Sequence, residues 1–176
     1  MKGSALKFGT KQVMDRIHEV IRDTATPSWV ESVPRNFGDP AAGSLKADEW
    51  RTMATIYLPI ALISLWGEGT THTSPDLASS FRQVLDHTMD LVQAVYLAGT
   101  RTTTESRTSA YRDYIISWLS KLRILHPTSN YRTNFHMALH VADFLCLFGP
   151  VRSWWCFPFE RLIGQLQRLP SNSKFG

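Results

Sequence analysis

Residues 147–166 read LFGPVRSWWCFPFERLIGQL. Pro150 and Pro158 enclose a short run that carries two adjacent tryptophans, a cysteine and an arginine. Because proline lacks a backbone N–H and restricts the residue before it, this run cannot lie inside a regular helix. Apolar residues at helical spacing begin again after Pro158. The stretch is therefore predicted to form an irregular aromatic loop between two helices.

The rest of the sequence predicts an all-α fold of about six helices, because apolar residues recur at helical spacing and no segment alternates like a strand. The predicted helices cover residues 11–23, 45–66, 74–99, 102–126, 134–149 and 158–166. Ser74, Thr102 and Asn134 are the predicted N-caps of three of them. In the second helix, Pro59 is expected to produce a kink or a break near Leu58. The side chains expected to face the core there are Trp50, Met53, Tyr57, Ile60 and Ile63.

Residues 24–44 contain three prolines and two glycines, a composition typical of an extended linker. Trp29, Val33 and Phe37 are the side chains expected to anchor this linker to a globular body. The sequence is accordingly divided into an N-terminal helix with a linker arm, residues 1–44, and a helical domain, residues 45–176.

The composition is that of a globular protein. The chain has 176 residues, 43% of them hydrophobic, and a net charge of +4, which is compatible with nucleic acid or acidic partners. Two cysteines cannot form a disulfide framework, and no signal peptide is recognised, so an intracellular, reducing environment is expected. The longest apolar run, residues 56–66, is shorter than the roughly 20 residues that cross a bilayer, so no membrane association is expected.

His136 and His140 lie four residues apart, so their side chains project from one face of the predicted helix. This spacing suits two ligands of a zinc ion, and Cys146 with Cys156 would complete the set if the loop folds back. The alternative is a pair of histidines that are packed or hydrogen-bonded near the aromatic loop.

Glu160 lies in the first turn of the last predicted helix, where a carboxylate stabilises the helix dipole. The alternative reading places it in a carboxylate cluster that holds a divalent metal ion, Mg²⁺ or Mn²⁺, for phosphodiester chemistry. No partner carboxylates are nominated by the sequence, so the chain is not expected to contain a complete active site.

Arginines and tryptophans are mixed around the aromatic loop. Such groups bind phosphates and stack on bases, and they equally stack on aromatic rings or pair with carboxylates inside a fold. The candidate DNA-binding residues are Arg152, Arg161, Arg168, Trp154 and Trp155. The basic residues of the fourth helix and its start are interpreted as a solvated face in preference to a phosphate-binding stripe. They are Arg101, Arg107, Arg112, Lys121 and Arg123.

The string GPVRSWWCFPFER, residues 149–161, also resembles the Gly-Pro-Val, Arg-Trp and Tyr-Pro-Phe-Glu-Arg signature of a domain of unknown function. That domain follows the transposase core in CACTA (En/Spm-type) DNA transposons. HMALH, residues 136–140, is similar to its His-x-x-x-His segment, and LKADEW, residues 45–50, to its Leu-Lys-x-His-Asp segment. PRNFG, residues 34–38, resembles the version in mushroom-forming fungi. The likeness covers residues 15–176 and departs from the plant versions at residues 155–157.

The resemblance implies a nuclear, DNA-associated protein from a cut-and-paste element, present here as a fragment or a solo copy. It makes Glu160 the candidate for the last carboxylate of an acidic metal-binding triad, with His136 and His140 as accompanying histidines. The remaining aspartates would lie in an upstream segment. The expected function is DNA handling, at transposon ends, within a larger transposase and without catalysis by this chain alone. The alternatives are a protein-interaction module that docks through Trp154 and Trp155, and a small structural zinc domain.

Overall fold

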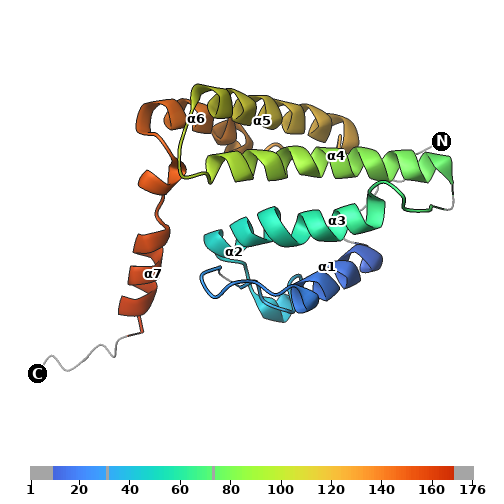
Figure 1. Ribbon diagram of the computed structural model, residues 1–176, viewed down its shortest axis with the longest axis horizontal. Coiled ribbons are helices and arrows are strands. Elements are labelled where there is room, and N and C mark those ends of the chain that lie inside the picture. The colour runs from blue at the N-terminus through green and yellow to red at the C-terminus, as the bar shows by residue number, and fades with distance from the viewer. Residues whose placement is uncertain (1–9, 31, 73, 169–176) are drawn as a thin grey trace, which may run out of the picture.

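The computed structural model describes residues 10–30, 32–72 and 74–168, without the side chains of residues 160 and 161. The described chain is helical and contains no strand, which confirms the predicted all-α class. The elements are α1 Lys11–Asp23, α2 Ala47–Thr52, α3 Leu58–Trp66, α4 Pro75–Ala98, α5 Glu105–Leu125, α6 Thr133–Phe148 and α7 Phe157–Leu166 (Figure 1). Because α2 continues into α3 through a π turn, the described residues form six separate helices, as predicted.

The predicted helix N-termini agree with the structure to within three residues. Ser74 caps α4 as expected, because its hydroxyl oxygen accepts a hydrogen bond of 3.2 Å from the Leu77 amide. The prediction of Thr102 as the next cap is wrong, since Thr104 caps α5 and Thr102 accepts hydrogen bonds from the Arg107 guanidinium. The Asn134 cap is also wrong, because α6 begins at Thr133 and its N-cap residue is Arg132, which makes no side-chain capping hydrogen bond.

The helix that contains Pro59 stays continuous through a π turn at Met53–Tyr57. There the Leu58 amide donates to the Met53 carbonyl, five residues earlier. Such a turn widens the helix just before the proline, whose ring would otherwise clash with the carbonyl four residues earlier. It also contributes one extra residue, which rotates the following side chains by about 100°.

The predicted inward face of this helix is therefore correct in its middle and wrong at its ends. Met53 and Tyr57 are buried as expected. Beyond the π turn the buried side chains are Ala61, Leu62 and Trp66. The extra residue turns Ile60 and Ile63 outward, and both are about half-exposed. Trp50 precedes the π turn and is half-exposed as well, so all three were wrongly expected in the core.

Residues 24–30 and 32–44 lack long helices and form turns and a short 3-10 helix, Pro40–Ala42, in agreement with the predicted linker. Val33 is buried and Phe37 packs against the same core, so both anchors are confirmed. Trp29 is 83% exposed, so its prediction as an anchor is wrong. Instead, His18 of α1 attaches the linker to the helices, because its Nε2 donates a hydrogen bond of 2.7 Å to the Phe37 carbonyl oxygen. The division of the chain at residue 44 stays a prediction.

The helix α4 separates two hydrophobic clusters. One lies between α1, α3 and the first half of α4, around Ile17, Met53 and Leu62. The other lies between the second half of α4, α5 and α6, around Ala94, Ile115 and Ala142. Figure 1 shows α4 in the middle, with α5 and α6 on one side and α3 and α1 on the other. At one end of this arrangement, the C-terminus of α4 lies beside α2 and the start of α7.

The last helix, α7, extends away from the other helices (Figure 1). Its apolar residues are exposed to solvent, at Phe159, Leu162, Ile163 and Leu166. None of the described helices combines the length and the apolar character that a membrane crossing needs.

Candidate nucleic-acid interface

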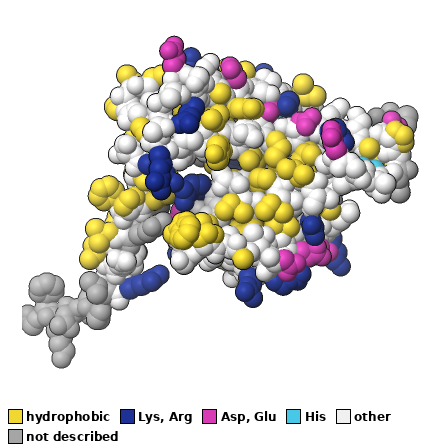
Figure 2. All heavy atoms as spheres, viewed as in Figure 1, with side chains coloured by type: hydrophobic (Ala, Val, Ile, Leu, Met, Phe, Trp, Pro, Cys, Tyr) yellow, Lys and Arg dark blue, Asp and Glu magenta, His cyan; other side chains and the backbone are white. Residues whose placement is uncertain are grey.

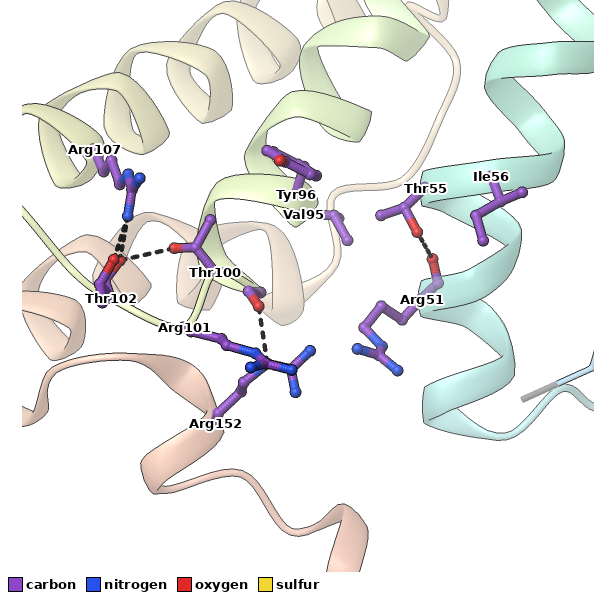
Figure 3. Close-up of a pocket in the computed structure, with 11 residues that line it drawn as sticks. Arg51, Thr55, Ile56, Val95, Tyr96, Thr100, Arg101, Thr102, Arg107 and Arg152 are labelled. Atoms are coloured by element: carbon purple, nitrogen blue, oxygen red, sulfur yellow. Dashed lines mark hydrogen bonds between the residues drawn. The ribbon is translucent and has the colours of Figure 1, made fainter. Parts of the chain in front are cut away.

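Four arginines line one pocket at the end of the molecule from which α7 leaves. Arg51 comes from α2, Arg101 and Arg107 from the α4–α5 connection and the start of α5, and Arg152 from the 3-10 turn Val151–Ser153. The pocket has a volume of about 560 Å³. We call it the arginine pocket. Figure 3 shows Arg51 pointing across the pocket toward Arg101 and Arg152.

Backbone carbonyls and a hydroxyl group hold two of these guanidiniums in place. Arg152 Nε donates to the Gly99 carbonyl oxygen at 3.1 Å, which ties the aromatic loop to the C-terminus of α4. Arg107 Nη1 donates to the Thr102 carbonyl oxygen at 2.9 Å and to the Thr102 hydroxyl oxygen. Each of these contacts uses only part of the five donors of a guanidinium, so further donors remain for a ligand.

Trp155 connects the arginine pocket with the aromatic loop. The guanidinium carbons of Arg51 and Arg152 lie over its ring, 5.4 Å and 5.2 Å from the ring centroid. Phe157 stacks on the same indole with ring centroids 4.6 Å apart. Trp154 is held by a hydrogen bond of 3.2 Å from its Nε1 to the Gly149 carbonyl oxygen. Cation–π contacts of this kind fix the directions in which the arginines point.

The described lining of the arginine pocket is basic. No Asp or Glu is among the described residues that line it. The ion pairs between described residues leave out Arg101, Arg107 and Arg152. These three guanidiniums repel one another, and an anion that enters the pocket reduces this repulsion. Figure 2 shows Lys and Arg side chains gathered where α7 leaves the body, next to hydrophobic ones.

An apolar groove of about 550 Å³ lies beside the arginine pocket. Its aromatic lining comes from Trp50, Tyr111, Trp154, Trp155 and Phe157. Tyr111 Oη donates to the Ala138 carbonyl oxygen at 2.9 Å, and burial raises the pKa of this phenol to about 12. Small side chains from α2, the π turn, α4 and α6 also line it, at Ala47, Ala54, Ala94, Ala98 and Ala138. We call this feature the apolar groove.

The two predicted histidines do come together. His136 Nε2 and His140 Nε2 are 3.1 Å apart, and His140 Nδ1 lies 3.3 Å from an Asp143 carboxylate oxygen. The other oxygen of Asp143 accepts a hydrogen bond of 2.7 Å from Arg112. The pair is on the surface, near the start of α6, whereas α7 follows the far end of that helix. The histidine pair and the arginine pocket are therefore separate features.

Metal binding by these residues stays a prediction. Among the side chains that the structure describes, no group of three or more His, Cys, Asp or Glu is placed to hold a metal ion. Cys146 and Cys156 are free and exposed. The histidine pair offers two nitrogens, fewer than the three protein ligands of a catalytic zinc site, so no reaction step is derived through a metal.

Glu160 and Arg161 lie in the first turns of α7, but their side chains are outside the described residues. Arg168 follows the other end of α7 and is not among the residues that line the arginine pocket. Of the predicted DNA-binding residues, the structure thus brings together Arg152, Trp154 and Trp155 around the two cavities.

Sequence reasoning did not nominate Arg51, Arg101 or Arg107 as site residues. The available signal was the run TRTTTESR, residues 100–107, in which two arginines and four threonines connect two helices with a single acidic residue. Arg51 had no comparable signal, because only the packing of α2 against the end of α4 places it in the pocket.

Comparisons with protein-family models, with curated proteins and with solved structures find no match to this chain. The functional interpretation consequently depends on the residues and their geometry.

Proposed function

We propose that this chain is a helical DNA-binding module that grips the phosphate backbone in the arginine pocket. The observation that carries the proposal is the convergence of four arginines, from three separate parts of the chain, on a pocket whose described lining has no acid. Guanidinium groups form paired hydrogen bonds with phosphate oxygens and are the usual side chains for this task.

The resemblance to the domain that follows the CACTA transposase core agrees with this function and places it in a larger, nuclear machine acting at transposon ends. In that setting we propose that the chain positions DNA, while the other carboxylates of an acidic metal-binding triad come from a partner segment. The Glu160 carboxylate and the histidine pair remain the residues proposed for contact with a metal ion held by a partner segment.

The second candidate function is a protein-interaction module. It is supported by α7, whose apolar residues face solvent instead of a core. The experiment below separates the two candidates, because only the first requires the arginine pocket for DNA binding.

The test is the affinity of the chain for a labelled DNA duplex over a range of salt concentrations. Arg101→Ala/Arg152→Ala removes two charges from the pocket. We expect it to weaken binding by about tenfold or more at low salt and to reduce the slope of log affinity against log salt by about 2, because each lost phosphate contact accounts for roughly 0.9.

The control is Arg22→Ala/Arg35→Ala, which removes the same charge from exposed residues outside the arginine pocket. This pair should leave the salt slope within about 0.5 of the original, since no specific phosphate contact is lost. If both double variants change the affinity equally, DNA binding comes from net charge alone. The pocket is then not the site, and the protein-interaction function takes its place.

A further inference from the structure

We infer that the apolar groove receives an unstacked base of single-stranded DNA while the phosphate beside it lies in the arginine pocket. The ligand is then a nucleotide of a single strand, bound through both its charged and its aromatic part. The inference rests on the proposed function, because the groove depends on the arginine pocket to hold the backbone.

The first support is the continuity of the two cavities. Arg51, Val95 and Gly99 line both of them, so the arginine pocket opens directly beside the groove. On the aromatic loop, too, a cationic group lies beside an aromatic one. The guanidinium carbon of Arg152 is 5.2 Å from the centroid of the Trp155 ring. A nucleotide has the same arrangement, with an anionic phosphate joined to a flat aromatic base.

The second support is the aromatic lining of the groove. Trp50 lines it from α2 and is about half-exposed, so part of its ring is open to a ligand. Trp154, Trp155 and Phe157 line it from the aromatic loop. Base–aromatic stacking contributes substantially to single-strand binding, and it tolerates any base because every base has a π-face. The volume of about 550 Å³ lies within the usual range of small-molecule sites.

The third support is the small side chains of the helices that line the groove. Ala54 of the π turn and Ala94 and Ala98 of α4 lie along it, where larger residues would fill the space. The lining is almost entirely apolar, so it offers few hydrogen bonds to the edges of a base. Recognition through stacking without edge contacts predicts little preference among the four bases.

The single-stranded form of the ligand follows from the apolar and aromatic character of this lining. In a duplex each base is paired and stacked, so its π-faces are not available to a protein cavity. A single strand exposes its bases and still supplies the phosphates that the arginine pocket requires. A purely apolar peptide is a poorer occupant, because it has no anionic group for Arg101 and Arg152 of the adjoining arginine pocket.

The experiment compares three ligands of equal length: a single strand, a duplex, and a single-stranded backbone with abasic sites. Their affinities for the whole chain are measured by fluorescence anisotropy, and circular dichroism verifies that each variant is folded. The test variant is Trp50→Ala, which removes an aromatic surface of the groove and no lining residue of the arginine pocket. The matched control is Trp29→Ala, because Trp29 is 83% exposed and lies outside both cavities.

We expect the single strand to bind more tightly than the abasic backbone, and Trp50→Ala to weaken single-strand binding by about fivefold or more. The same variant should change duplex and abasic binding by less than about twofold and leave the salt slope unaltered, because no phosphate contact is lost. Trp50→Phe should restore most of the affinity, and Trp29→Ala should have no effect.

Two results would overturn the inference, and they differ in what they say of the proposed function. If all three ligands bind equally and Trp50→Ala changes none of them, the groove does not hold a base, while DNA binding by the arginine pocket stands. If no ligand binds at all, both fail. A variant that leaves DNA binding unchanged and alters the sedimentation coefficient would assign the groove to a second copy of the chain, which also contradicts the inference.

Discussion

The basic residues of α4, α5 and their connection have different surroundings at the two ends of this helix pair. At the connection between them, Arg101 and Arg107 line the arginine pocket, whose described lining contains no acid. Further along the pair, Asp90 accepts hydrogen bonds of 2.7 Å from both Lys121 and Ser117. The same residue types thus line an open pocket in one region and form hydrogen bonds and an ion pair within the fold in the other. The difference comes from the acid that the neighbouring helix supplies, as Asp90 of α4 does for Lys121 of α5, and not from the number of basic residues.

The largest expected effect is a loss of stability at low pH, and it comes from the part of α4 and α5 whose polar groups pair within the fold. His87 of α4 is buried and stacks on Trp118 with ring centroids 5.8 Å apart. Burial, followed by repulsion from His126, lowers the pKa of His87 to about 4. The unfolded chain titrates near 6.5, so between these pH values it binds more protons than the folded chain. The free energy of unfolding should therefore fall by about 3 kcal/mol as the pH drops from 6.5 to 4.

Urea denaturation of the wild type and of His87→Phe at several pH values measures this loss. Phenylalanine keeps an aromatic ring against Trp118 and cannot take up a proton, so this part of the pH dependence should disappear. Identical pH profiles for the two proteins would show that His87 is not responsible for the acid sensitivity.

A smaller effect is expected from Asp90→Asn in the same region. The carboxylate is 13% exposed and accepts from two donors, and an amide would leave the Lys121 ammonium without its countercharge. Because Lys121 is 38% exposed, water compensates part of the loss. We expect the free energy of unfolding to fall by about 1–2 kcal/mol in a urea titration. Asp86→Asn, an exposed change on the same helix, should stay within about 0.5 kcal/mol.

The smallest effect is expected from Arg112→Ala and Arg101→Ala, compared by thermal unfolding. Arg112 forms a half-exposed ion pair of 2.7 Å with Asp143, which contributes about 0.5 kcal/mol. Arg101 has no ion pair among the described residues, so its removal should leave the stability unchanged or slightly raise it. A clear loss of stability in Arg101→Ala would contradict the contrast between the two regions.

The helices were predictable from the sequence because their signals are local. Apolar spacing, the Ser74 cap with Pro75, and the prolines around the aromatic loop each act within a few residues. The register of α3 was not predictable, because the way the chain accommodates Pro59 decides it. The sequence offered a kink or a break, and the structure has a π turn.

The arginine pocket was not predictable for a different reason. Its residues are separated by about fifty positions, at Arg51, Arg101 and Arg152, and only packing brings them together. The solvated-face interpretation is correct for Arg112 and Lys121, which pair with acids on α6 and α4. Arg101 and Arg107 are exposed as well, but they also line the arginine pocket, which helical periodicity could not indicate because it carries no information about neighbouring elements.

The π turn at Met53–Tyr57 has a consequence for how this sequence is compared with others and how it changes by mutation. Deleting one codon there would restore an ordinary α-helix and turn α2 by about 100° relative to α3. Trp50 and Arg51 would then leave the two cavities that they line. A gap of one position between residues 52 and 59 in an alignment therefore marks a homologue that has lost this site, even where every arginine is retained.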